Sequence, residues 1–270
     1  MHLSRSFLFV PGDRPDRFDK AAASGAHQVI LDLEDAVRPS EKDKARAAIA
    51  SWDQRAQAIV RINGSDSPWF ESDLDFVRRL GLSKLMIPKA EPKVVRTAAA
   101  GLGSAVEIVG LIETVSGLLQ IREICQEAQV RRLAFGNLDF ALDAGVTETD
   151  RELDPVRLQL TLESKFSQLA PPVDGVFAAF SDTAALATRV QRAKALGLGG
   201  KLCIHPSQVA SVNNGFLPDA EEFAWARRVI EGVETTGAGA ISVDGKMVDR
   251  PVMERARAIL RAGQQINLEK

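Results

Sequence analysis

Short runs of apolar residues recur along the chain, and each is followed by a stretch in which apolar positions have helical spacing. Most runs are continuously apolar rather than alternating, which is typical of parallel strands that are covered on both faces. In the stretches between them, intervals of three and four separate positions such as Val115, Leu118 and Leu119, and this spacing predicts helices. The predicted strands are Ser6–Val10, Gln28–Leu33, Ala58–Ile62, Lys84–Ile87, Glu107–Ile112, Arg132–Phe135, Gly175–Ala178 and Lys201–Ile204.

Eight strand–helix units in one chain predict either a closed barrel or a doubly wound sheet of the α/β class. The regular spacing favours the barrel, as does the absence of a Gly-x-Gly-x-x-Gly turn after an early strand. The length of 270 residues agrees, because a barrel of this kind needs about 250 residues. We therefore predict a (β/α)₈ TIM barrel over residues 1–215.

The chain continues beyond the eighth unit. A helical pattern runs from about Asp219 to Glu234, and a loop of small residues follows at 236–240. Pro251 then suits the first turn of a last amphipathic helix. Residues 216–270 are too few to fold alone. We predict that they form a C-terminal helical extension, which packs on the barrel or on a neighbouring subunit.

Composition excludes several classes of partner. The net charge of −2 and the pI of about 6.0 give no electrostatic footprint for nucleic acid. No apolar run approaches the roughly 18 residues of a membrane span, and the apolar run near the N-terminus is too short for a signal peptide. We therefore expect a cytoplasmic protein with no membrane partner. Cys125 and Cys203 lack metal-ligand spacing and are expected to be buried.

Polar side chains follow several predicted strands, at the end of the barrel where catalytic groups lie in this fold. Acids that converge at the ends of buried strands need a cation, because an unpaired buried charge is costly. In the absence of a Cys/His cluster the ligands are hard oxygens, which suit Mg²⁺ or Mn²⁺. Glu113 and Asp139, at adjacent strand ends, could supply the one or two carboxylates that magnesium uses. Arg61 offers a planar fork for a substrate carboxylate.

Two other residues at strand ends admit two interpretations each. Lys89 could form a Schiff base, but neighbouring acids favour an electrostatic or ion-pair role. His205, followed by Pro206, could be a general base or a structural hydrogen-bonding residue, and we favour the structural role.

Taken together, these residues resemble the citrate lyase β-subunit family, which includes malyl-CoA and citramalyl-CoA lyases. Asn137 departs from the pattern, because a small residue is more usual there. Residues 137–152 and 160–172 follow the family only loosely, and we expect these loops to shape the substrate pocket. The matching segments are Arg5–Gly12, Asp32–Val37, Val60–Gly64, Pro88-Lys89, Ile112–Thr114, Phe135-Gly136 with Asp139, Gly200–Gln208 and Asp244–Asp249.

The resemblance implies a phosphoenolpyruvate/pyruvate-type barrel in which Glu113 and Asp139 bind Mg²⁺ and Arg61 contacts the substrate. We further expect Arg5, Lys89 and Glu113 to bind substrate, and Arg61 to be catalytic as well. Asp249 is implied as an acid/base that enters the site from an adjacent subunit. The active enzyme would then be a homo-oligomer, a trimer or hexamer.

The implied reaction makes or breaks a carbon–carbon bond in a 3-hydroxyacyl thioester such as citryl-, malyl- or citramalyl-CoA. Its products are an acyl thioester and a 2-keto acid, and the carrier is coenzyme A or an acyl-carrier protein. Arg14, Arg17 and Lys20 could bind the carrier, or they could form a solvated helix face.

Three alternatives remain. A thioesterase would share the metal and the carrier and differ only in delivering water. A metal-dependent aldolase acting on free keto acids would share the barrel and the metal pair. A non-catalytic binding protein ranks lowest, because it has no need to keep together the four residues Glu113, Asp139, Arg61 and Asp249.

Overall fold

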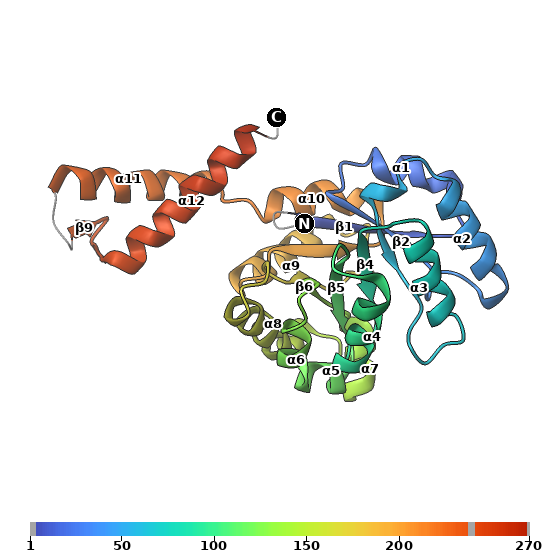
Figure 1. The fold of residues 1–270 in the computed structure, drawn as a ribbon. Coiled ribbons are helices and arrows are strands. Elements are labelled where there is room, and N and C mark those ends of the chain that lie inside the picture. Colours follow the sequence, from blue (N-terminus) through green and yellow to red (C-terminus); the bar gives the residue numbers. More distant parts are fainter. Residues whose placement is uncertain (1–3, 237–240, 269–270) are drawn as a thin grey trace. The chain divides into compact units, whose positions relative to one another are not determined.

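The first part of the chain is built on eight parallel strands that close into a barrel (Figure 1). The computed structural model describes residues 4–236 and 241–268. The chain divides into two compact units, Met1–Phe216 and Leu217–Lys270, and each is described by itself. The strands are β1 (Ser6–Pro11), β2 (Gln28–Asp32), β3 (Ile59–Arg61), β4 (Lys84–Ile87), β5 (Glu107–Ile112), β6 (Val130–Phe135), β7 (Val173–Asp174) and β8 (Gly200–Cys203).

Strand residues are buried on both faces of the sheet, which explains why the runs are continuously apolar. One set of side chains, including Phe7, Ile30 and Met86, fills the inside of the barrel. The alternate set, such as Leu8 and Leu31, packs outward under the helices. The predicted (β/α)₈ barrel is thus confirmed.

Helices and short 3₁₀ turns connect the strands. No helix in the described part of the chain is both long and apolar enough to cross a membrane. The barrel helices are α1 (Phe18–Ala22), α2 (Lys42–Ser51), α3 (Phe70–Arg79), α4 (Pro92–Leu102), α5 (Val115–Leu119), α6 (Ile121–Cys125), α7 (Asn137–Ala144), α8 (Asp150–Phe166), α9 (Thr183–Ala195) and α10 (Val209–Gly215). The 3₁₀ turns are η1 (Pro15–Arg17), η2 (Pro39–Glu41), η3 (Arg55–Gln57) and η4 (Pro206–Gln208).

The seventh strand lies elsewhere than predicted. The apolar run Gly175–Ala178 suggested a strand, but β7 is Val173–Asp174 and pairs with β6 and β8. The prediction was wrong because Asp174 interrupts the apolar pattern, and this charged residue is nevertheless buried.

Asp174 is buried because two cations meet it from neighbouring elements. Arg157 on α8 donates from Nε to Oδ1 of Asp174 at 2.7 Å. Lys201 on β8 donates from Nζ to Oδ2 at 2.5 Å. These contacts join the sheet to α8, and all three residues are almost completely shielded from solvent.

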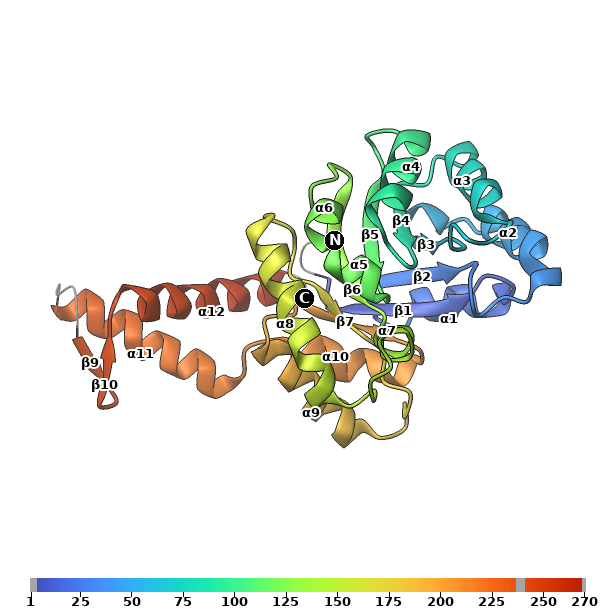
Figure 2. The same ribbon diagram turned by 90° about the horizontal axis from the view of Figure 1, so that it is seen from below.

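The second unit is a pair of helices with a small hairpin, α11 (Ala220–Thr236), β9 (Ile241–Val243), β10 (Lys246–Val248) and α12 (Arg250–Leu268). Both helices agree with the predicted extension, whereas the hairpin was not expected (Figure 2). Its turn is Asp244-Gly245, with φ of 51° and 73°, and Asp-Gly is a strong signal for such a turn. Within the predicted loop of small residues, 237–240 lie outside the described residues.

The pairing of Asp174 predicts a large effect on stability. We expect Asp174→Asn to lower the free energy of unfolding by about 3–5 kcal/mol, because Lys201 keeps its buried charge without a counter-charge and Arg157 keeps only Asp150 and Asp154. Asp75→Asn is the matched control, since exposed Asp75 pairs with Arg78 and Arg79 and such pairs contribute about 1 kcal/mol or less. Urea unfolding measures both, and equal losses would contradict this role for Asp174.

Candidate active site

The carboxyl ends of β2, β3, β5 and β6 surround a pocket of about 320 Å³. Active sites of this fold lie at this end of the barrel. Apolar side chains that include Phe9, Leu111, Val176 and Leu202 line the pocket on the barrel side. The polar residues that line it are Asp32, Asp35, Arg61, Glu113, Asn137 and Asp139.

Glu113 follows β5 and is nearly inaccessible to solvent. Its Oε1 accepts a hydrogen bond of 2.7 Å from the backbone N–H of Lys89. A Cβ atom at Gly136 would lie 2.5 Å from the Cβ of Glu113, so only glycine at this position leaves room for the carboxylate. Burial raises the pKa of Glu113 to about 7, against the lowering effects of the Lys89 N–H and of Arg61, and the charge of Asp139 raises it further.

Asp139 lies in the first turn of α7, which follows β6, and its side chain is exposed. The structure therefore brings Glu113 and Asp139 to one pocket, where their negative charges repel each other. Among the described residues, no three His, Cys, Asp or Glu side chains gather into a set that could hold a metal ion by themselves. Magnesium commonly takes only one or two protein carboxylates and completes its shell with water and substrate oxygens. The chemistry and the charge of this pair fit that ion.

Arg61, at the end of β3, is held by acids from the end of β2. Its Nε and Nη2 donate to the two carboxylate oxygens of Asp32 at 2.7 and 2.6 Å. Its Nη1 lies 2.9 Å from Oε2 of Glu34. One edge of the guanidinium is thus occupied by Asp32, and a substrate carboxylate would have to use the remaining Nη hydrogens. Binding of the substrate by Arg61 stays a prediction.

Glu34 adds a second buried acid beside the first. Burial raises the pKa of Glu34 to about 8, although Arg61 acts in the opposite direction, and Glu113 is among the charges that raise it. Asp32 and Glu34 belong to the matching segment Asp32–Val37, but the sequence predicted no role for either residue. The structure shows that they orient Arg61 and make the pocket more acidic.

Lys42 on α2 fixes the loop that carries Glu34. Its buried Nζ donates to the carbonyl oxygens of Leu33 and Glu34 at 2.6 and 2.8 Å. It also donates to Oδ1 of Asn63 at 2.6 Å. Burial is the main cause that lowers the pKa of Lys42. This lysine was missed because it looks like one more charge on a polar surface helix.

Asp73 on α3 holds Asn63, the residue of the loop after β3 that Lys42 also contacts. Its Oδ2 accepts hydrogen bonds from the backbone N–H and from Nδ2 of Asn63, at 2.9 and 2.6 Å. Asp73 is completely buried, and its other oxygen accepts from Arg46. The loops after β2 and β3 are therefore tied together beneath Arg61.

Comparison with known proteins gives the family of this chain. The model of the HpcH/HpaI aldolase/citrate lyase family matches residues 5–206. This chain belongs to that family. The resemblance expected from the motifs, to the citrate lyase β-subunit, is confirmed by a citrate lyase subunit beta-like protein of Deinococcus radiodurans, which is 35% identical over 96% of each chain.

Other relatives differ in their named activities. An L-malyl-CoA/beta-methylmalyl-CoA lyase of Cereibacter sphaeroides is 31% identical and covers 98% of this chain and 96% of its own. A (3S)-malyl-CoA thioesterase of the same organism has the same identity and the same coverage. The crystal structure of protein CitE from Mycobacterium tuberculosis in complex with magnesium, acetoacetate and coenzyme A is 31% identical. It superposes with a TM-score of 0.87 over 97% of this chain and 99% of that one.

Lys89 and Arg5, which we expected to bind substrate, lie at opposite ends of the barrel in this citrate lyase family member. Lys89, which has a positive φ of 42°, presents its backbone N–H to Glu113, while its Nζ lies 3.4 Å from Oδ2 of Asp66. Arg5 precedes β1 and therefore lies at the amino end of the barrel. The six residues of β1 span on the order of 16–20 Å, which an arginine side chain cannot bridge. We correct the prediction and remove Arg5 from the candidate site.

Asp249 lies in the second unit, immediately before α12. Its Oδ1 accepts a hydrogen bond of 3.3 Å from the backbone N–H of Val252, which is the contact of a helix cap. This local role accounts for an aspartate at the position. The acid/base role that the family resemblance implies stays a prediction.

A second cleft, of about 610 Å³, adjoins the pocket and shares Phe9, Ala36 and Ile204 with it. Arg14, Arg17 and Lys20 line this cleft, so all three face one cavity.

His205 lines the same cleft as these three cations. Its Nδ1 accepts from the backbone N–H of Ser207 at 3.2 Å, and its ring stacks on Phe180 with a centroid distance of 4.6 Å. These contacts agree with the structural role that we favoured for His205.

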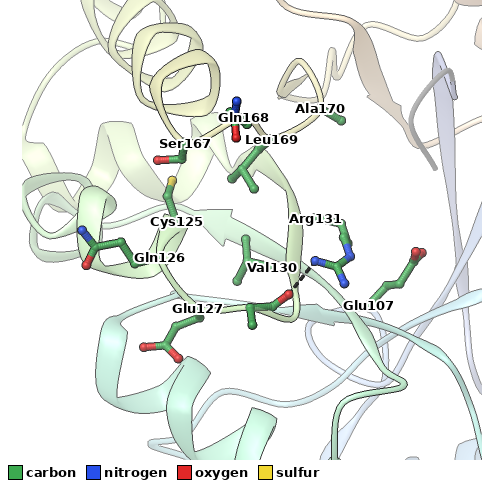
Figure 3. Close-up of a pocket in the computed structure, with 11 residues that line it drawn as sticks. Glu107, Cys125, Gln126, Glu127, Val130, Arg131, Ser167, Gln168, Leu169 and Ala170 are labelled. Atoms are coloured by element: carbon green, nitrogen blue, oxygen red, sulfur yellow. Dashed lines mark hydrogen bonds between the residues drawn. The ribbon is translucent and has the colours of Figure 1, made fainter.

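A further cavity, of about 530 Å³, lies at the amino ends of β5 and β6 (Figure 3). Glu107, Arg131 and Gln168 line it together with Cys125. Burial raises the pKa of the Cys125 thiol to about 11, so the thiol is unreactive at neutral pH. The expectation that both cysteines are buried is confirmed. Glu113 and Asp139 do not line this cavity.

The contacts of Lys42 predict that the loop after β2 depends on it. We expect Lys42→Met to lower the free energy of unfolding by about 2–4 kcal/mol, because three buried oxygens lose their donor. Lys44→Met, on the exposed side of the same helix, should change it by about 0.5 kcal/mol or less. Urea unfolding of the two variants gives the comparison. If both variants lost only a little free energy of unfolding, water would have replaced the ammonium group of Lys42 as the donor.

Proposed function

We propose that this chain is a magnesium-dependent carbon–carbon lyase that cleaves or forms a 3-hydroxyacyl thioester. Its products in the cleavage direction are an acyl thioester and a 2-keto acid. The observation that carries the proposal is the pair of carboxylates Glu113 and Asp139, which lie with Arg61 around one pocket at the carboxyl end of the barrel. The relatives named as malyl-CoA lyase and the CitE complex with magnesium, acetoacetate and coenzyme A support it.

Glu113 and Asp139 are the proposed ligands of Mg²⁺, with Mn²⁺ as an alternative ion. When bound, the ion supplies Lewis-acid chemistry toward the oxygens of a 2-hydroxy or 2-keto acid. The N–H of Lys89 fixes the orientation of the Glu113 carboxylate, and Gly136 gives it room.

Arg61 is proposed to bind the carboxylate of the keto-acid part. Asp32 and Glu34 hold the guanidinium rigidly, so that little conformational freedom is lost when the substrate binds. In cleavage the hydroxyl group gives its proton to solvent water at the mouth of the pocket and becomes the carbonyl of the keto acid, and the acid that later protonates the enolate takes a proton back from solvent. The electron pair of the broken carbon–carbon bond moves into the thioester, which forms an enolate. The apolar wall that includes Leu111 and Val176 keeps water from that enolate.

The enolate must then accept a proton at its α-carbon. We propose Asp249 as the acid, delivered from a neighbouring copy of the chain, and the active enzyme as a homo-oligomer, a trimer or hexamer. A cytoplasmic location likewise stays a prediction.

The second cleft is the proposed site of the thioester carrier, coenzyme A. Arg14, Arg17 and Lys20 face it and would bind the phosphate groups of the carrier. This cleft shares Phe9, Ala36 and Ile204 with the first pocket, which supports the proposal. A carrier bound there could therefore pass its thioester into the pocket.

The second candidate is a thioesterase, which the Cereibacter sphaeroides relative of that name favours. Such an enzyme uses the same metal and carrier but directs water to the thioester carbonyl. The two reactions release different products, so a direct assay distinguishes them.

We expect malyl-, citramalyl-, β-methylmalyl- or citryl-CoA to yield acetyl- or propionyl-CoA and a 2-keto acid with Mg²⁺, and no product with EDTA. Glu113→Gln should lower kcat/KM on the order of 100-fold or more, because even indirect supports of a metal commonly contribute 10–100-fold. Glu107→Gln is the control, since it lies at the other end of β5. Free CoA and hydroxy acid as the only products would indicate the thioesterase, and full activity in EDTA would exclude the proposed metal.

For Asp249, we expect Asp249→Asn and Glu113→Gln to be inactive alone and to recover activity when mixed under subunit exchange. One subunit then supplies the metal site and the other supplies the acid. Asp244→Asn, in the turn of the β9–β10 hairpin that precedes Asp249, should remain active without mixing. No recovery with verified exchange would mean that Asp249 serves its own barrel or only caps α12.

A further inference from the structure

The two proposed metal ligands lie just beyond the ends of neighbouring strands. β5 and β6 are paired as far as Ile112 and Phe135. One more backbone bond follows, from the N–H of Gly136 to the carbonyl of Ile112 at 2.9 Å. Beyond it the chain continues into α5 after Glu113 and into α7 after Gly136. The separation of Glu113 and Asp139 therefore depends on how α5 and α7 are held together.

Glu113 and Asp139 are fixed to different degrees. Glu113 is buried, and its carboxylate accepts a hydrogen bond from the N–H of Lys89. The side chain of Asp139 is exposed, and within residues 4–236 and 241–268 its carboxylate makes no hydrogen bond or ion pair. The position of Asp139 is thus set by the placement of α7.

Asp143 lies one helical turn after Asp139 on α7. Side chains four residues apart lie on the same face of a helix. Oδ2 of Asp143 accepts a hydrogen bond of 2.7 Å from the backbone N–H of Val115, the first residue of α5. Asp139 and Asp143 therefore face the side of α7 on which the chain continues from Glu113 into α5.

This hydrogen bond is the direct polar link between α5 and α7, which are neighbours in the barrel (Figure 1). The first N–H groups of a helix have no partner within the helix. Thr114, the residue before α5, accepts from the N–H of Gly117 at 3.0 Å, so the N–H of Val115 is left to Asp143. In the described part of the chain, no other hydrogen bond or ion pair joins the two helices. A charged acceptor makes this bond stronger than one between neutral groups.

We propose that Asp143 is a positioning residue for the metal site. By holding the start of α5 to α7, it keeps the carboxylates of Glu113 and Asp139 at a separation that one cation can bridge. Asp143 does not line the pocket, and we assign it no contact with the substrate. The inference rests on the proposed function, because it takes Glu113 and Asp139 as the metal ligands.

The physical reason is that the two ligands carry like charges. Their repulsion opposes a close approach before an ion is bound. A bond between the segments that carry them offsets this repulsion in the metal-free protein. Residues that orient metal ligands in this way commonly contribute about 10–100-fold to metal affinity.

The alternative interpretation is that Asp143 only stabilises α5. Acidic side chains near the start of a helix interact favourably with its N–H groups. That role predicts a loss of stability without a loss of metal affinity. A positioning role predicts weaker metal binding at nearly unchanged stability, so the two can be distinguished.

The first test examines the bond in the metal-free protein by amide hydrogen exchange. We expect the Val115 amide to exchange at least about tenfold faster in Asp143→Ala than in the wild-type protein, because a bond to a charged acceptor is lost. Asp143→Asn keeps an oxygen that can accept, and it should retain most of the protection. Equal exchange of Val115 in Asp143→Ala and in the wild-type protein would overturn the proposal.

The second test titrates the metal-free proteins with Mg²⁺ in the presence of pyruvate. We expect Asp143→Ala to weaken Mg²⁺ binding about tenfold, and Asp143→Asn to weaken it much less. Asp182→Ala is the matched control, because exposed Asp182 accepts from the N–H of Ala185 at the start of α9, at 2.9 Å, and does not line the pocket. This control should bind Mg²⁺ as the wild-type protein does.

Urea unfolding of the same variants completes the comparison. The midpoints of Asp143→Ala and Asp182→Ala should both lie close to that of the wild-type protein. A lowered midpoint with unchanged Mg²⁺ affinity in Asp143→Ala, or an equal loss of affinity in Asp143→Asn, would overturn the positioning role. Failure of the wild-type protein to bind Mg²⁺ would overturn the proposed metal site as well. The exchange of the Val115 amide needs no metal, so these two failures can be told apart.

Discussion

The active site depends on how the charge of Arg61 is matched by the acids around it. Asp32 takes one edge of the guanidinium and Glu34 approaches the other, so the positive charge is neutralised before any substrate arrives. Glu113 and Asp139 then remain at the same pocket as excess negative charge. The raised pKa of Glu113, about 7, is the expected result of burial beside such acids. A divalent cation is the natural complement of this arrangement.

The ion network around Asp174 differs from the pocket in its balance of acidic and basic groups. There Asp174 meets both Arg157 and Lys201. The network continues from Arg157 to Asp150 and Asp154 on α8, which also pair with Arg189 and Arg192. It contains no acid in excess, and its effect is to join the sheet to α8. Acidic and basic residues are thus fully paired around Asp174, where they stabilise the fold. At the pocket, the carboxylates of Glu113 and Asp139 remain without a paired cation among the described residues. What separates the two sites is the count of charges and their access to a pocket.

Much of the fold and part of the site could be predicted from the sequence. Continuously apolar strands gave the barrel, and Glu113, Asp139 and Arg61 were found because they end such strands. β7 was misplaced because a paired charge can be buried inside an element. Lys42 and Asp73 were missed for the same reason, since only tertiary contacts remove them from solvent. Arg5 was misassigned because it begins a motif whose other end reaches the site. The role of Asp249 stays a prediction, because it would require a second copy of the chain.

The most direct test of this account is a calorimetric titration of the metal-free protein with Mg²⁺ in the presence of pyruvate. We expect saturable binding to the wild-type protein, and we expect Glu113→Gln and Asp139→Asn each to weaken this binding strongly. Glu107→Gln, at the other end of β5, should bind as the wild-type protein does. Equal binding by all four proteins would contradict the claim that the uncompensated pair Glu113 and Asp139 holds the metal.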